Sequence, residues 1–183
     1  MTKLILGFVG QMASGKGTAV AYLKKKYGAS TYRFSGILTD ILNRLYLPND
    51  REHLQKLSQC LRETFGEETL AKVMAEDVKN DTNNIIAIDG IRRPGDVVHL
   101  KNVPGFVLVY ITADIEKRFE RLSKRREKTD DLSKTFEQFK QEHHNEAEIK
   151  IEEVAKDAAE RIDNNETIYE LHKQLDKLVN KFT

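Results

Sequence analysis

A glycine-rich loop between a buried strand and a helix constrains this chain more than any other feature. The apolar run at residues 4–9 predicts a buried strand, the segment GQMASGKGT follows from Gly10 to Thr18, and a helical pattern begins at about Lys16. Glycines permit backbone angles that let successive N–H groups point at one anion, and a helix N-terminus adds a positive dipole. This order of strand, loop and helix predicts an α/β domain that binds phosphate groups.

The loop departs from its usual pattern at one position. In G-x-x-x-x-G-K-[ST] a hydroxyl residue follows the lysine, whereas here Gly17 follows Lys16 and the hydroxyl comes one residue later, at Thr18. Direct ligation of Mg²⁺ by a hydroxyl beside the lysine is therefore disfavoured, and the ion would keep more of its water. The residues expected to contact the phosphates of ATP are Gly10, Ala13, Ser14, Gly15, Lys16, Gly17 and Thr18. The alternative is a Gly/Ser-rich turn that binds nothing.

Strand-like and helix-like segments alternate along the chain. Continuous apolar runs typical of buried parallel strands lie at residues 4–9, 31–34, 85–88 and 106–111, with a weaker fifth at 161–163. Helical patterns lie at residues 16–26, 37–45, 54–64, 69–79, 115–126 and 168–182. The alternation predicts one α/β domain over residues 1–183, with a mainly parallel sheet and ligands at the carboxyl ends of its strands.

The second motif is IIAIDGIRRPGD. Asp89 ends the third predicted strand, at the sheet edge from which the glycine loop also emerges, and an acid there can hold Mg²⁺ directly or through its water. Arg92 and Arg93 follow, and guanidinium groups bind phosphate bidentately. The alternative is that Asp89 caps a turn and the arginines form surface ion pairs.

A basic segment, RFERLSKRREK, follows the fourth predicted strand. Arg118, Arg121 and Arg125 recur at spacings of three and four and so share one helical face. We expect Arg121 and Arg125 to stabilise the charge of a transferring phosphoryl group. The alternative is an exposed basic helix end that complements its own dipole.

Polar residues after the second strand are the candidates for an acceptor site. Ser35 and Gly36 open a helical pattern, where Ser35 either contacts an acceptor or caps the helix. Arg62 shares a helical face with Gln55 and Gln59, which suits either a pocket lining or ordinary surface polarity.

These motifs together resemble a known family. G-K-G-T is similar to the loop of adenylate kinase and related nucleoside monophosphate kinases. The D-G-I-R-R-P segment resembles their D-G-F-P-R stretch, and more closely the D-[GV]-[IV]-R-x-P pattern of archaeal relatives and phage deoxynucleoside monophosphate kinases. The resemblance implies a P-loop NTPase three-layer α/β/α sandwich with a five-stranded parallel sheet. It also implies a helical acceptor-binding insert at about residues 35–80 and a lid at about residues 124–145.

The same resemblance implies site roles. Arg92 is the first choice to hold the acceptor's phosphate and Arg93 the second. Adenylate kinases carry an arginine about five residues after the serine that matches Ser35, and here Thr39 and Asp40 stand there. The sequence therefore leaves the acceptor open.

The function expected from the resemblance is ATP- and Mg²⁺-dependent transfer of the γ-phosphoryl group to a nucleoside or deoxynucleoside monophosphate. One alternative is dephospho-CoA kinase, whose members share the loop position, the lid helix and a closing turn like Asp163–Asn165, but whose loop usually reads G-S-G-K-S. Another is an ATP-binding regulator or assembly factor that is not a kinase.

Composition limits the other classes of function. Lys and Arg total 30 against 29 Asp and Glu, which argues against nucleic acid as the main partner. No apolar stretch approaches the roughly 20 residues of a membrane span. The single cysteine, Cys60, excludes an internal disulfide, suits the cytoplasm, and is expected to be buried. We expect a small nucleotide as the binding partner. The protein is expected to be a monomer or a homodimer.

Overall fold

The computed structural model describes residues 3–125, 135–143 and 146–183, and its centre is a five-stranded sheet in the order β2-β3-β1-β4-β5. The strands are β1 (Leu4–Val9), β2 (Ser30–Arg33), β3 (Ile85–Ile91), β4 (Phe106–Thr112) and β5 (Glu160–Asp163). Every adjacent pair is parallel, so the carboxyl ends of all the strands share one edge. The predicted parallel sheet is confirmed, including the weak fifth strand.

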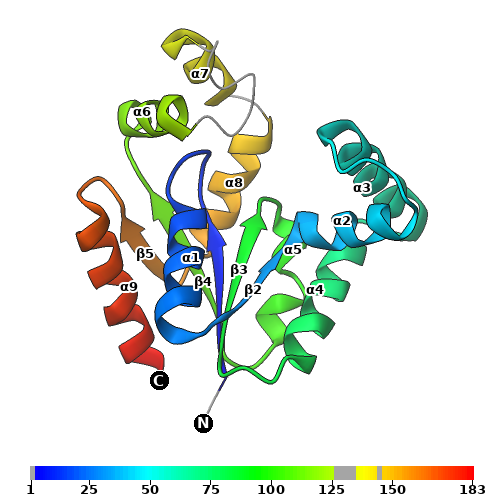
Figure 1. The fold of residues 1–183 in the computed structure, drawn as a ribbon, viewed down its shortest axis with the longest axis horizontal. Helices are drawn as coiled ribbons and strands as arrows, with labels where there is room; N and C mark the ends of the chain where they lie inside the picture. The colour runs from blue at the N-terminus through cyan, green and yellow to red at the C-terminus, as the bar shows by residue number, and fades with distance from the viewer. Residues whose placement is uncertain (1–2, 126–134, 144–145) are drawn as a thin grey trace.

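Helices cover both faces of this sheet, which makes three layers (Figure 1). On one face, α1 (Lys16–Tyr27) and α9 (Ile168–Phe182) enclose a core that includes Leu6, Phe8, Leu23 and Leu175. On the other face lie α4 (Thr69–Asn80), α5 (Pro94–Val97), the 3-10 helix η1 (Leu100–Asn102) and α8 (Glu146–Lys156). Within the described ranges, no helix has the length and apolar character needed to cross a membrane.

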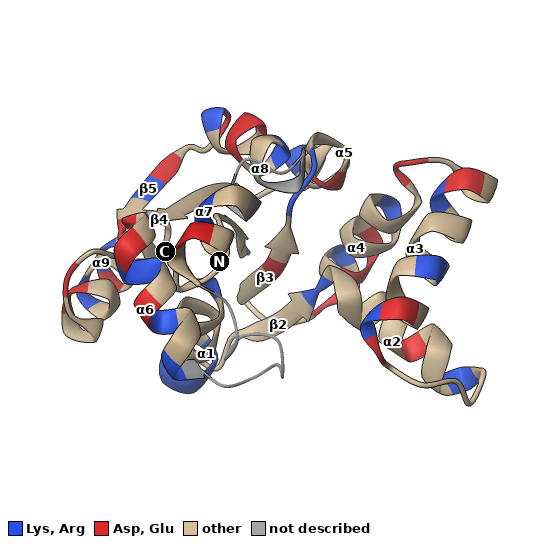
Figure 2. Ribbon diagram, turned by 90° about the horizontal axis from the view of Figure 1, so that it is seen from above, with Lys and Arg blue, Asp and Glu red and all other residues tan. Residues whose placement is uncertain are grey.

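A helical insert follows β2. Helices α2 (Phe34–Arg44) and α3 (Arg51–Phe65) lie beyond β2, on the far side of the molecule from α9 (Figure 2). The predicted strand at residues 31–34 is wrong by one residue, because Phe34 is buried as the first residue of α2. Arg33 occupies the N-cap and makes no side-chain cap bond. Ser35 therefore lies inside the first turn, and the capping interpretation of Ser35 is wrong.

The exposure of Cys60 corrects a second expectation. The apolar face of α3 is formed by Leu54, Leu57 and Leu61, which pack against the core at helical spacing. Cys60 falls outside that stripe, so it faces solvent and not the predicted interior.

Besides the short α5 and η1, two longer helices were not predicted. After α6 (Ile115–Arg125) come α7 (Phe136–His143) and α8, whose sequences are so rich in charge that their few apolar positions show no clear period. Phe139 of α7 is nevertheless 3% exposed and contacts Phe119 of α6, and Ile151 of α8 enters the core. Part of the predicted lid, residues 126–134 and 144–145, lies outside the described residues.

A polar cluster joins α1 to α9 away from the strand ends. Oδ1 of Asp176 accepts hydrogen bonds from the Tyr22 and Tyr27 hydroxyls, both at 2.7 Å, and Oδ2 pairs with Lys26 Nζ at 2.7 Å. Burial alone would raise the pKa of Asp176, but the bonds from Lys26 and the tyrosines outweigh it, so the pKa is lowered.

We expect Asp176→Asn to lower the melting temperature by about 3 °C at pH 7, because the amide loses the ion pair and one acceptor. A carboxylate with a lowered folded-state pKa stabilises the fold above its unfolded pKa and loses that effect as pH falls through the folded value. The difference between wild type and variant should therefore vanish on acidification. Asp157→Asn, which removes the exposed Lys101–Asp157 pair, is the matched control and should change little. A pH-independent difference at Asp176 would contradict this account.

Candidate phosphate-binding site

The glycine loop curves around its own lysine. It leaves β1 at Val9 and enters α1 at Lys16, and it passes through left-handed backbone at Ala13, with φ of 60°, and Gly15, with φ of 107°. The Lys16 Nζ lies over the loop and donates to the carbonyl oxygens of Gly10 at 2.5 Å and Gln11 at 2.9 Å. The structure thus brings together the predicted loop residues and places the ammonium group within their curve.

Close packing requires glycine at two of the three glycine positions in the loop. A Cβ at Gly10 would lie 2.3 Å from the carbonyl oxygen of Ile111, and one at Gly15 would lie 2.1 Å from Nδ2 of Asn164. Around Gly17, by contrast, such a Cβ would have no described atom within 4 Å beyond its chain neighbours and the backbone of its own helix. Gly10 and Gly15 are therefore required by the packing of the loop, while Gly17 leaves open space at the start of α1.

Asn164, which follows β5, packs against the loop and donates a hydrogen bond to it. Its Nδ2 donates to the Ser14 carbonyl at 2.8 Å, its backbone N–H donates to Thr112 at 2.8 Å, and it is 6% exposed. Asn164 had no predicted role. Its position at the carboxyl end of a strand, on the edge where the loop emerges, was the available signal.

The arginines predicted to share one helical face, Arg118, Arg121 and Arg125, do not have the same surroundings. Arg118 is 3% exposed and donates to the carbonyls of Ala113 at 3.1 Å and Met12 at 3.4 Å, so it holds the loop. Arg121 donates from Nη2 to the Asn164 carbonyl at 2.7 Å. The side chain of Arg125 lies outside the described part of the chain.

Two buried polar atoms near the loop lack a hydrogen-bond partner among the described residues: Ser14 Oγ and Arg121 Nη1. Buried polar groups are normally paired, and both of these can donate a hydrogen bond. With Lys16 and the curved backbone they form a set of donors that suits the oxygens of a polyphosphate. The loop and its surroundings therefore fit the phosphates of ATP.

Asp89 is engaged by a residue that was not predicted. Asp89 on β3 is in register with Arg33 on β2; its Oδ2 lies 3.2 Å from Arg33 Nη2, and its Oδ1 accepts from the Gly90 N–H at 2.7 Å. Within the described ranges, no three His, Cys, Asp or Glu side chains gather to hold a metal. The exposed Thr18 and Asp89 could supply only a sparse ligand set, which suits Mg²⁺ that retains its water.

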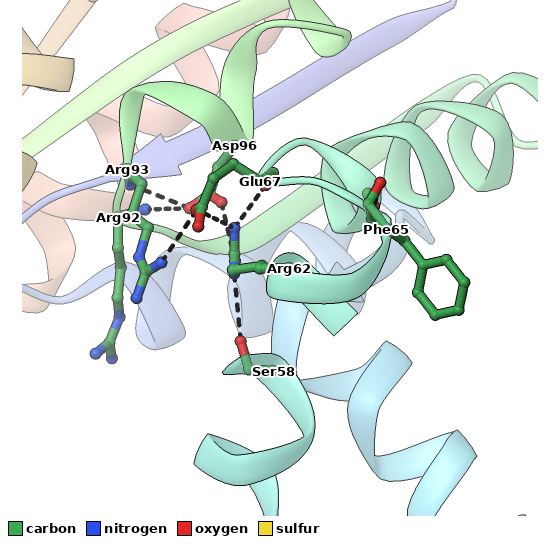
Figure 3. Close-up of polar contacts among 8 residues, drawn as sticks. Ser58, Arg62, Phe65, Glu67, Arg92, Arg93 and Asp96 are labelled. Carbon is green, nitrogen blue, oxygen red and sulfur yellow. Dashed lines mark hydrogen bonds and ion pairs between the residues drawn. The ribbon is translucent and has the colours of Figure 1, made fainter. Parts of the chain in front are cut away.

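The predicted acceptor arginines differ in how much of each guanidinium is engaged. Arg62 is 9% exposed and donates to the Glu67 carbonyl at 2.9 Å, and Arg93 lies 3.7 Å from the Glu67 carboxylate. The exposed Arg92 extends away from these groups (Figure 3), and no hydrogen bond or ion pair joins its guanidinium to another described residue. Ser35 and Gly36 are half-buried in the first turn of α2. Arg92 and Arg93 are both exposed, and of the two only Arg93 is paired with another described residue.

A family model described as an AAA domain matches residues 9–140. A UPF0200 protein from Methanoregula boonei is 30% identical over 127 residues, which cover 69% of each chain. This chain belongs to the AAA domain family and to the UPF0200 proteins. A second UPF0200 protein, from Hyperthermus butylicus, is 25% identical over 181 residues, which cover 99% of this chain and 96% of the relative.

Solved structures match the fold of this AAA-domain protein over nearly its whole length. TT1252 from Thermus thermophilus superposes with a TM-score of 0.61 at 17% identity and 100% coverage of both chains. Shikimate kinase from Bacteroides thetaiotaomicron gives 0.62 at 14% identity and 97% coverage of both. Deoxyadenosine kinase from M. mycoides with bound dATP gives 0.55 at 16% identity, covering 97% of this chain and 98% of that one. These matches confirm the P-loop kinase fold, while the narrower nucleoside monophosphate kinase subfamily stays a prediction.

The contrast between Gly15 and Gly17 yields a matched pair of variants. We expect Gly15→Ala to weaken ATP binding at least about tenfold, because its Cβ would strike Asn164 and φ of 107° strains any L side chain. Gly17→Ala should bind ATP normally, since its Cβ would meet open space. Titration calorimetry with ATP·Mg²⁺ measures both affinities, and equal losses in the two variants would contradict this account of the loop.

Proposed function

We propose that this AAA-domain protein is an ATP-dependent phosphotransferase whose acceptor is a small nucleotide, a nucleoside or deoxynucleoside monophosphate. The observation that carries the proposal is the set of donors at the loop: Lys16 over its curve, with Ser14 Oγ and Arg121 Nη1, which have no hydrogen-bond partner in the described ranges. The proposal is supported by the similarity in fold to the deoxyadenosine kinase with bound dATP.

The residues of the loop have assigned roles in this proposal. Backbone N–H groups from Gly10 to Thr18 bind the phosphates, and Lys16 and Arg121 stabilise negative charge on the transferred group, a role that Arg125 also takes. Thr18 and Asp89 would hold Mg²⁺, directly or through its water, and the ion would neutralise negative charge on the phosphates of ATP. Because the loop is fixed before substrate arrives, little reorganisation is needed during transfer.

The acceptor is bound on the other side of the strand edge. Arg92 holds the acceptor's phosphate, Arg93 assists it, and Ser35 and Gly36 contact the acceptor at the start of α2. The insert at about residues 35–80 forms that side of the site, and the segment at about residues 124–145 closes over ATP, which keeps water from the transferred group. We also propose a cytoplasmic location, because the single cysteine suits a reducing compartment.

One observation favours a phosphate over a hydroxyl as the accepting group. A hydroxyl acceptor, as in dephospho-CoA kinase, benefits from a general base. Asp89, a candidate base, already accepts from the Gly90 N–H through Oδ1 and pairs with the Arg33 guanidinium through Oδ2, so a hydroxyl would have to share these oxygens with both groups. A phosphate needs no such base, and it suits the guanidinium of Arg92, which is exposed and pairs with no described residue.

The proposal is tested with a panel of nucleoside monophosphates, deoxynucleoside monophosphates and dephospho-CoA, each with ATP·Mg²⁺, by following ADP release with and without acceptor. At least one monophosphate should stimulate release. Lys16→Met should reduce the stimulated rate by at least about a thousandfold while the circular dichroism spectrum is unchanged, because electrostatic stabilisation of the transferred group is lost. Stimulation by dephospho-CoA alone would select that alternative, and no stimulation would favour a regulator.

The two neighbouring arginines provide a second test. Arg92→Ala should raise the acceptor KM by about thirtyfold and leave the KM for ATP unchanged, since a charged hydrogen-bond donor to phosphate is lost. Arg93→Ala should have a smaller effect, because Arg93 already pairs with Glu67. The reverse order would show that Arg93 is the acceptor's ligand.

A further inference from the structure

A buried carboxylate lies behind the acceptor arginines. Asp96 in α5 is 3% exposed, and its Oδ2 accepts hydrogen bonds from the backbone N–H groups of both Arg92 and Arg93, each at 3.0 Å. One oxygen of Asp96 thus fixes the turn that directs the Arg92 side chain away from Asp96 and Arg62 (Figure 3). A buried carboxylate is retained only where its charge is compensated, so its second oxygen needs a partner.

That partner comes from the insert. Asp96 Oδ1 accepts no hydrogen bond among the described residues and instead lies 3.5 Å from Nη2 of Arg62, near the end of α3. The other donors of Arg62 are directed to its own helix and the turn after it, with Nε 3.4 Å from Ser58 Oγ and Nη1 2.9 Å from the Glu67 carbonyl. The guanidinium therefore spans from α3 to Asp96, and both charges are removed from water.

Two further contacts join the same parts of the chain. Arg93 Nη1 lies 3.7 Å from the Glu67 carboxylate, and His99 Nε2 lies 2.7 Å from Glu68 Oε2. Glu67 and Glu68 connect α3 to α4, so the junction between these helices is tied to the segment from Arg92 to His99 at three points. The Arg62–Asp96 pair is the buried one of the three, and its side chains are 9% and 4% exposed.

We propose that Asp96 is a positioning residue that couples the insert to the acceptor arginines, so that the place of α3 and the direction of Arg92 are set together. The effect of this coupling on catalysis rests on the proposed function. The physical link between α3 and the Arg92–Arg93 turn does not. When an acceptor settles against the insert, the Arg62–Asp96 pair holds the Arg92–Arg93 turn at a fixed distance from α3. Arg92 then meets the acceptor's phosphate without a separate rearrangement.

Asp96→Asn separates the two jobs of the carboxylate. Its amide oxygen can still accept from the Arg92 and Arg93 N–H groups, while its amide nitrogen meets Arg62, donor against donor, so only the link to α3 is broken. We expect faster hydrogen exchange in α3 with the Arg92 and Arg93 amides still protected. The acceptor KM should rise about tenfold, with kcat within about twofold and the KM for ATP unchanged. Asp96→Ala should deprotect both regions.

Glu63→Gln is the matched control, because Glu63 is exposed on α3 beside Arg62 and pairs only with Gln59 in the described structure. Asp96→Glu should restore part of the acceptor KM if charge and reach are what matter. Unchanged exchange in α3 together with an unchanged acceptor KM in Asp96→Asn would overturn the proposal. If no acceptor stimulates ADP release, the proposed function fails, and exchange in α3 alone decides whether Asp96 couples the two segments.

Discussion

The hydrogen bond from the Asn164 side chain to the Ser14 carbonyl is the interaction on which the candidate site depends. This buried bond joins residues that are 150 positions apart in the sequence. The shape of the N-terminal loop therefore depends on a residue that follows β5, near the C-terminal end of the chain. Gly15 must be glycine because Asn164 lies against it, and Arg121 reaches the site by donating to the carbonyl of the same asparagine. Loss of one partner would leave a buried polar group unsatisfied, at a typical cost of about 1–3 kcal/mol.

Arginines around the strand ends are divided between holding the protein together and facing a ligand. Arg118 and Arg62 are buried and direct their guanidinium groups at carbonyls and carboxylates, whereas Arg92 is exposed and contacts none in the described residues. A buried guanidinium fixes the parts it joins because breaking its contacts is costly. On the proposed function, this division fixes the segment that carries Arg92 while leaving its guanidinium open to the acceptor's phosphate.

The strands and the glycine loop could be predicted because each depends on local pattern: continuous apolar runs and glycine spacing. The end of the third strand was predicted too early, since β3 continues through Asp89 to Ile91. The roles of Asn164, Arg33 and Asp96 could not, because each is defined by a partner on another strand or helix. The error at Cys60 has a related cause, since which face of α3 is buried is decided by what packs there. Helices α7 and α8 were missed because charged residues obscure the few positions that are buried, such as Phe139 and Ile151.

The most direct test of the central claim, that the loop is a preformed phosphate cradle, is the ¹⁵N–¹H spectrum of the protein during titration with ATP·Mg²⁺. The account predicts that the amide shifts concentrate between Gly10 and Thr18 and saturate with a single dissociation constant, while the amide of Asn164 stays protected throughout. Binding that leaves the Gly10–Thr18 amides unshifted at saturating ATP, or an Asn164 amide that becomes exposed as ATP binds, would contradict it.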